Sequence, residues 1–394
     1  MTSWNSSFPQ KRTVSRVLTA SAGERLRTLR ELFGLTQIEL SRLSGVSQAW
    51  ISKLENNDGD PGPGMLELIA DATGTPVKFF DVSPSTVPLD SLRFRKTASA
   101  SKKMTKRIHA LYGESYRVTE QLVQDTYPAP PLPFATEDEL DQEQIETLAM
   151  ATREALRLAP DKPVPHLTRA LERAGVAVAP ISLTGPGGET PITSGKHFGV
   201  SYWGGPGEAA LIGYFTGSGD RDRFTLAHEL GHLVLHTFRP RCADPEREAH
   251  QFAGAFLLPY QRAVEEFAGR LTLTSLAHKK AAWGVSIQAL IMRAAAVDAI
   301  DEPRRQSLFV QLNHRGWRKE EPVTVGHEHP LLLWKLLSQR YGDKPYRLAS
   351  DELAIPPAIL RSIAPTPAPT GPATGPRPGR VTQLRRQPLG QHGR

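Results

Sequence analysis

The stretch that decides the fold is RFTLAHELGHLVLH, residues 223–236. It contains His228-Glu229-Leu230-Gly231-His232, so two histidines stand four residues apart. On a helix this spacing puts both imidazoles on one face, where they can reach a single metal ion. Glu229 lies one residue off that face, so it can accept a proton from a water without ligating the metal. The pattern predicts a helix that carries a metal centre.

The remainder of this predicted helix is almost wholly apolar. Its apolar members are Phe224, Leu226, Ala227, Leu230, Leu233, Val234 and Leu235. Two histidines and a glutamate on a buried helix are costly unless they have partners, which favours a metal centre. The competing interpretation is that the histidines are hydrogen-bonded core residues and that Glu229 caps a neighbouring segment.

A catalytic zinc site usually takes a third protein ligand. We expect it to be Glu246 in the next apolar segment, PEREAHQFAGAFLLP (residues 245–259), with Glu248 as the alternative. His250 lies one turn after Glu246 and could support that ligand by a hydrogen bond. His236 follows His232 by one turn, about 6 Å along the helix axis, so we expect it to contact a ligand or the substrate and not the metal.

A second motif lies near the N-terminus, where LTQIELSRLSGVSQAWISKLENN (residues 35–57) predicts two helices joined by a tight turn. Gly45 suits the turn, and Ser47 can cap the second helix. The early residues of the second helix would face a DNA major groove, and the first helix would touch phosphate. The candidate DNA contacts are Gln37, Ser47, Gln48, Ala49, Trp50, Ser52 and Lys53. The alternative is a helical interaction module that no longer binds DNA.

Both motifs resemble known families. Residues 223–259 and the later segment KKAAWGVSIQALIMRA are similar to the ImmA/IrrE metallopeptidases, over about residues 145–300. This resemblance implies metal ligands at His228, His232 and Glu246 and a general base at Glu229, while His250 stands where that family usually has Asn or Asp. Residues 23–81 resemble the lambda-repressor-like (XRE) helix-turn-helix family, which implies an ion pair between Arg30 and Glu55.

The chain has 394 residues, which is enough for several domains. Prolines at PAPPLPF (residues 128–134) indicate a linker, and strand patterns occur at VAVAPI, HFGVSYW, AALIGYF and SLFVQL. We expect an all-α helix-turn-helix domain, then an α+β zincin-like domain with a small sheet and a helix that starts near Phe224, then a helical C-terminal region. The expected boundaries are 1–22 (arm), 23–81 (helix-turn-helix), 82–127 (basic helical connector), 128–136 (linker), 137–313 (metallopeptidase-like), 314–364 (small helical region) and 365–394 (disordered basic tail).

Composition narrows the classes of protein and of metal site. The chain has no apolar run of the roughly 18 residues that a membrane helix needs and no apolar stretch behind its first charges, so we expect a cytoplasmic protein that makes no membrane contact. Cys242 is the only cysteine, so a metal must be held by histidines and carboxylates. The net charge of +7 is compatible with binding to nucleic acid.

Together these features predict a DNA-binding transcription regulator with a peptidase domain that uses one Zn²⁺ per chain, with Mn²⁺ as an alternative. The resemblance implies a protein substrate, such as a repressor or an antitoxin-like partner. The second partner would be a double-stranded DNA operator, read by a homodimer because helix-turn-helix proteins usually read two half-sites. One alternative is a regulator whose peptidase-like domain senses metal or a ligand without cleavage. Another is a phage-linked or toxin-antitoxin component that acts by protein contact.

Overall fold

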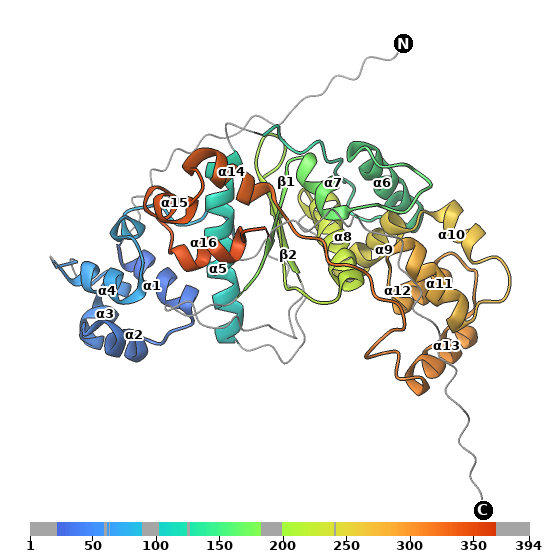
Figure 1. Ribbon diagram of the computed structural model, residues 1–394, viewed down its shortest axis with the longest axis horizontal. Coiled ribbons are helices and arrows are strands. Elements are labelled where there is room, and N and C mark those ends of the chain that lie inside the picture. The colour runs from blue at the N-terminus through green and yellow to red at the C-terminus, as the bar shows by residue number, and fades with distance from the viewer. Residues whose placement is uncertain are drawn as a thin grey trace, which may run out of the picture.

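The computed structural model describes residues 22–58, 61–62, 64–88, 102–123, 127–182, 199–239 and 242–367. In these residues the protein is mainly helical and contains one three-stranded sheet (Figure 1). No helix in the described part of the chain is long and apolar enough to cross a membrane. The expected N-terminal arm and basic tail lie almost wholly outside the described residues.

Short helices form the N-terminal part of the chain, at the blue end of Figure 1. They are α1 (Ala22–Phe33), α2 (Gln37–Ser44), α3 (Gln48–Glu55), α4 (Met65–Thr73) and the 3-10 turn η1 (Val77–Phe80). Gly45 ends α2 with a φ of 74°, which a residue without Cβ adopts readily. The Ser47 hydroxyl accepts a hydrogen bond from the backbone N–H of Trp50 and so caps α3. The predicted turn and cap are confirmed.

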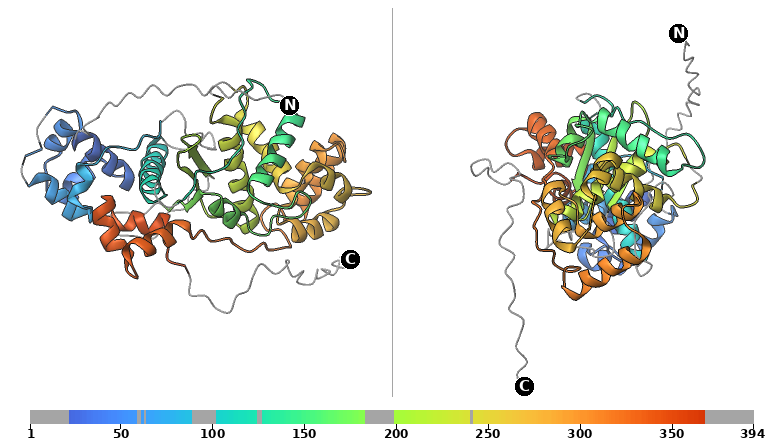
Figure 2. Two further views of the ribbon diagram at one scale, coloured as in Figure 1. Left: turned by 90° about the horizontal axis from the view of Figure 1, so that it is seen from above. Right: turned by 90° about the vertical axis from the view of Figure 1, so that its right-hand side faces the viewer.

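The long helix α5 (Lys102–Val123) lies between the N-terminal helices and the sheet (Figures 1 and 2). It packs against α1, and its Tyr112 hydroxyl donates to the carbonyl of Leu211 at 2.7 Å. Three helices near the C-terminus return to pack beside it: α14 (Leu332–Tyr341), α15 (Pro345–Leu353) and α16 (Pro357–Ile363). Segments from both ends of the chain therefore cover α5.

The sheet has the order β1-β3-β2, with β1 (Val176–Pro180), β2 (Gly199–Trp203) and β3 (Ala210–Tyr214). β1 is parallel to β3, whereas β2 is antiparallel to it and pairs Gly199 with Tyr214. Three of the predicted strands are thus confirmed. Because side chains alternate along a strand, each face of the sheet joins a different core. Leu211 lies in one apolar core, together with the N-terminal helices, α5 and α14–α16. Ile212 lies in a second core, on the other face of the sheet.

Eight helices in the described residues between 142 and 314 form the core on the other face of the sheet. They are α6 (Gln142–Ala155), α7 (Leu167–Arg173), α8 (Gly219–His236), α9 (Pro245–Leu257), α10 (Tyr260–Glu266), α11 (Leu273–Trp283), α12 (Ile287–Ala296) and α13 (Glu302–His314). Among them, α7 and α8 pack directly against the strands. The expected α+β class is confirmed. Two details were wrong: α8 begins five residues before Phe224, and SLFVQL is part of α13, where Leu308 and Leu312 are buried one helical turn apart.

A buried ionic network joins α1, α5 and the end of α15. Arg25 donates to both carboxylate oxygens of Glu114, at 2.6 and 3.1 Å, and the Arg117 guanidinium donates to the same carboxylate at 2.8 Å. Arg117 also donates to the carbonyl of Leu353. Burial alone would raise the pKa of Glu114, but the charges and hydrogen bonds of Arg117 and Arg25 bring it below its usual value.

We predict that Glu114→Gln destabilises the fold by about 3 kcal/mol at neutral pH, because two buried guanidinium groups lose their counter-charge. The folded-state pKa of Glu114 is lowered, so its contribution to stability is present above the unfolded pKa and is lost as the pH falls. The difference between wild type and variant, measured by urea unfolding, should therefore shrink from pH 6 towards pH 3.

Glu120→Gln on the same helix is the matched control. Burial and the charge of Glu208 raise the pKa of Glu120, so removing its charge should leave stability at neutral pH unchanged or slightly higher. Equal losses in the two variants would contradict a specific role for the Arg25–Glu114 pair.

Candidate functional site

The candidate metal centre lies where α8 packs against α9. Gly231, inside the motif of α8, sets this approach: a Cβ there would stand 3.0 Å from the ring of Phe252 and 3.3 Å from the Cα of Ala249. A larger residue would push the helices apart. The short connection between the helices and their close packing bring Glu246, in the first turn of α9, over the two histidines of α8.

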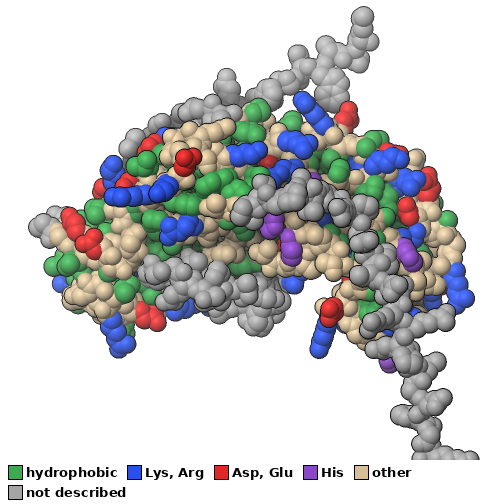
Figure 3. All heavy atoms as spheres, in the orientation of Figure 1, with side chains coloured by type: hydrophobic (Ala, Val, Ile, Leu, Met, Phe, Trp, Pro, Cys, Tyr) green, Lys and Arg blue, Asp and Glu red, His purple; other side chains and the backbone are tan. Residues whose placement is uncertain are grey.

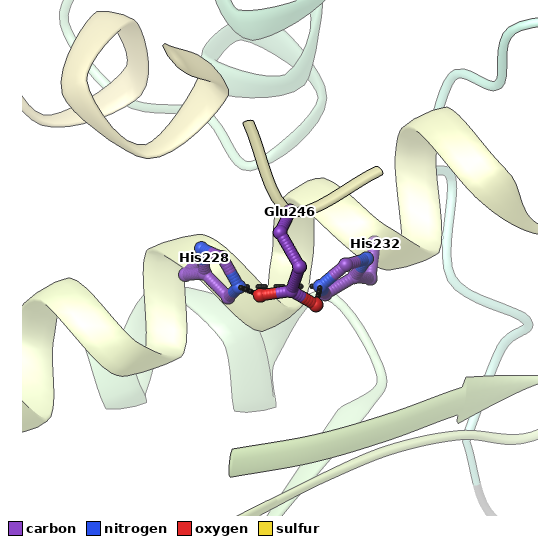
Figure 4. Close-up of side chains that lie close together, drawn as sticks. All are labelled: His228, His232 and Glu246. Atoms are coloured by element: carbon purple, nitrogen blue, oxygen red, sulfur yellow. Dashed lines mark hydrogen bonds and ion pairs between the residues drawn. The ribbon is translucent and has the colours of Figure 1, made fainter. Parts of the chain in front are cut away.

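The three expected ligands face one another (Figure 4). The Glu246 carboxylate lies 3.4 Å from Nε2 of His228 and 3.4 Å from Nε2 of His232, and the two Nε2 atoms are 3.2 Å apart. One ligand atom from each residue lies within 4.8 Å of the others. Two imidazoles and one carboxylate are the donor set of a catalytic zinc site, and the Glu246 side chain is partly exposed. These residues therefore fit the ion.

The protonation of these groups suits metal binding. Burial lowers the pKa of His228 to about 4, so this imidazole is neutral at pH 7, as a ligand must be. Burial alone would raise the pKa of Glu246, but hydrogen bonds from His228 and His232 and their charges hold it well below its usual range. Glu246 therefore offers an ionised carboxylate to a cation.

Glu229 is held beside the centre by strand β2. The Ser201 hydroxyl lies 2.8 Å from Oε2 of Glu229 and 3.1 Å from its carbonyl oxygen, and can donate to either. Gly199, two residues earlier on the same face of β2, leaves the room that this carboxylate fills, because a Cβ there would overlap it. Neither residue was predicted from the sequence. The only signal was the period of two in β2, which puts Gly199 and Ser201 on one face.

A chain of buried polar side chains extends behind His232. Its Nδ1 lies 2.9 Å from Nδ1 of His236, and Nε2 of His236 lies 3.1 Å from Glu248. Arg239 donates to the same carboxylate at 2.8 Å. The structure thus brings Glu246, and not the alternative Glu248, to the facing Nε2 atoms. Cys242 also lies near His236 and Glu248, but the Arg239 guanidinium already neutralises that carboxylate.

The structure places His250 on the other side of the centre. Its ring lies edge-on to that of His228, with centroids 4.9 Å apart, and it contacts Phe224 at 5.2 Å. Its position against His228 lets it fix the orientation of that imidazole by packing. The hydrogen bond from His250 to Glu246 that the sequence led us to expect stays a prediction.

The helix-turn-helix residues form a second candidate site. Arg30 donates to Glu55 through Nε at 2.7 Å and Nη2 at 2.9 Å, which confirms the ion pair that the family resemblance implied. The Gln37 side chain donates to Glu55 and accepts from Gln48, so the first helix orients the start of α3. This link was not foreseen, because it joins side chains on two helices.

Exposure separates the candidate DNA contacts into two groups. Ser47, Gln48, Ala49 and Lys53 are exposed, whereas Gln37, Trp50 and Ser52 are half-buried. Trp50 packs against the apolar core, so only part of its ring faces solvent. On the face drawn in Figure 3, the described Lys and Arg side chains are interspersed with Asp and Glu instead of forming one patch.

Two family models match the regions of the chain that contain these residues. Residues 26–80 match the family model described as helix-turn-helix, and residues 217–295 match the one described as an IrrE N-terminal-like domain. No curated protein shows significant similarity to the chain. The chain therefore combines a DNA-binding helix-turn-helix domain with a metallopeptidase-like domain, in the order that the motifs predicted. It is a regulator with a peptidase-like domain.

We predict that His236→Phe lowers zinc affinity by about 10- to 100-fold, because it keeps a ring but removes the partner of His232 Nδ1. A competition titration of the full chain against a chromophoric chelator measures this. His278→Phe, an exposed histidine of α11, is the matched control and should not change the affinity. If the two variants bind zinc equally well, the polar chain behind His232 does not support the centre.

Proposed function

We propose that this protein is a transcription regulator that binds a double-stranded DNA operator as a homodimer and whose zinc-dependent peptidase domain hydrolyses a peptide bond in a regulatory protein partner. The observation that carries the proposal is the convergence of His228, His232 and Glu246 beside Glu229. A family match to the IrrE N-terminal-like domain over the same residues supports it.

The residues divide the proposed reaction between them. His228, His232 and Glu246 would hold one Zn²⁺, which when bound polarises a peptide carbonyl and acidifies a water; Mn²⁺ would suit the same ligands. Glu229 takes the proton from the attacking water and returns it to the leaving amine. Ser201 fixes the position of the Glu229 carboxylate by its hydrogen bond. His236 and His250 orient the two imidazoles.

On the DNA side, we propose that α3 enters the major groove with Ser47, Gln48, Ala49, Trp50, Ser52 and Lys53. Gln37 would contact the phosphate backbone from α2. The exposure of Gln48 and Lys53 supports this assignment. A protein substrate such as a repressor or antitoxin-like partner is consistent with a regulator that couples DNA binding to proteolysis.

The test of cleavage compares wild type, His232→Ala and Glu229→Gln. Wild type should contain about one zinc per chain by elemental analysis, His232→Ala should lose it, and Glu229→Gln should keep it. Cleavage, read as new protein N-termini in cells that express each form, should fall by about 10²- to 10⁴-fold in Glu229→Gln.

Each outcome separates the proposal from its rivals. Regulation that survives in Glu229→Gln but not in His232→Ala would show that the domain senses metal without cutting. Absence of zinc from wild type, even after zinc is supplied, would refute the metal-dependent function altogether. Regulation that survives in Gln48→Ala and Lys53→Ala would favour action through protein contacts alone.

For the DNA interface, we predict that Lys53→Ala weakens binding and lowers the dependence of log affinity on log salt by about two units, because the homodimer loses one phosphate contact in each subunit. The probe is a duplex selected by the wild-type chain from a random library, titrated at several salt concentrations. Lys319→Ala, which removes a charge beyond α13, is the control. An unchanged salt dependence in Lys53→Ala would exclude a phosphate contact for this side chain.

A further inference from the structure

A large cavity lies next to the metal centre but contains none of its three ligands. It has a volume of about 980 Å³ and is bounded by α6, the N-terminal part of α8, α9, α12, α13 and residues 318–327. These helices lie together at the right of Figure 1. This volume is at the upper end of the range for sites that bind a ligand or a peptide segment.

The cavity begins beside the metal centre. His250 and Phe224 line it, and the ring of His250 also contacts the ligand His228. Glu246, His250 and Gly254 follow one face of α9 at intervals of four residues, and the last two line the cavity. Eight residues of helix span about 12 Å. An extended peptide that crosses the metal centre would therefore place about four residues along this face.

The charged groups of the lining are unbalanced. Seven lysines and arginines line the cavity against four carboxylates: Arg221, Arg247, Lys280, Arg293, Arg305, Arg318 and Lys319 against Glu146, Asp220, Glu320 and Glu321. Three of these carboxylates already have internal partners. Arg293 binds Glu146 at 2.9 Å, and Lys280 binds Asp220 at 3.0 Å and Glu321 at 2.7 Å.

The charged side chains at the solvent-exposed edge of the cavity, its rim, are mainly positive. Arg305 pairs with Glu302, which is not part of the lining, and Arg247 approaches the exposed Asp244 at 3.8 Å. Arg318 and Lys319 are exposed beyond the end of α13. Arg318 and Lys319 thus stand beside one exposed carboxylate, Glu320, so this part of the rim presents a net positive charge to an occupant.

The wall between these charges is apolar. Its members include Ile145, Phe224, Ala289, Met292, Phe309 and Val323. Met292 is 48% exposed although it belongs to a helix that is otherwise well packed. Its unbranched side chain can adapt to the shape of an occupant. An apolar wall under a cationic rim suits a chain that carries both apolar and acidic side chains.

We infer that this cavity binds the substrate polypeptide on one side of the cleaved bond and selects an extended segment in which acidic and apolar residues are mixed. The inference rests on the proposed peptidase function and assigns its substrate class. Arg318 and Lys319 attract the acidic side chains, and the wall from Phe224 to Met292 takes the apolar ones. His250 lies at the point where the cavity meets the metal centre.

The test measures binding without cleavage, on the full-length Glu229→Gln chain. The probe is a fluorescein-labelled peptide of ten alternating glutamates and leucines, compared by fluorescence anisotropy with one of alternating lysines and leucines. The acidic peptide should bind more tightly than the basic one. Arg318→Ala with Lys319→Ala should weaken its binding by about ten-fold, which is about 1.4 kcal/mol, because the peptide loses two exposed ion pairs.

Two further variants locate the bound peptide. Lys344→Ala with Arg347→Ala removes the same charge from the exposed surface near α15 and should leave affinity unchanged. Ala289→Trp should fill part of the cavity and weaken binding, with circular dichroism to verify the fold. Equal losses in the two double variants, no loss in Ala289→Trp, or equal binding of the two peptides would overturn the inference.

The outcome is independent of whether the chain cuts proteins. Binding of the acidic peptide in the cavity by a chain that cleaves nothing would refute the proposed peptidase function but leave the cavity as a peptide site. Cleavage of partners at sites with no acidic residues nearby would support the peptidase and refute this inference.

Discussion

The close packing of α8 against α9 is the contact on which the candidate metal centre depends. At one point along the interface, Gly231 lets the ring of Phe252 approach the α8 backbone. At another, the buried Arg239–Glu248 pair joins the end of α8 to the first turns of α9. With the interface fixed at both points, Glu246 has little freedom to move away from His228 and His232. The donor geometry is therefore a property of helix packing and not of the side chains alone.

Each functional group of the centre is also held from outside the motif. Strand β2 orients Glu229 through Ser201, and His236 orients His232. Ser201 lies 28 residues before Glu229 in the sequence, whereas His236 lies one turn after His232 on the same helix. The motif thus supplies the reacting groups, whereas the sheet and the last turn of α8 help to determine which way they point.

The parts that sequence reasoning predicted are those that local spacing determines. Two histidines four residues apart on an apolar helix, a glycine in a tight turn and a serine cap each depend on a few neighbouring residues. Position-specific partners such as Ser201 were missed, because no local pattern links a strand residue to a helix. SLFVQL was assigned to a strand because short apolar runs suit a strand or a helix equally well; tertiary packing of Leu308 and Leu312 decided for the helix.

The core described above passes without a break from the helix-turn-helix through α5 to the sheet and α14–α16. Residues 26–80 belong to this core and residues 217–295 to the other one, and the two cores meet at the sheet, whose strands contribute side chains to both. A ligand that binds only the folded form at one end stabilises the whole unit by mass action, including the other end. Because the strands belong to both cores, a ligand bound at α8 and one bound at α3 would act on a folding equilibrium that the sheet couples, although α5 and the sheet lie between the two sites.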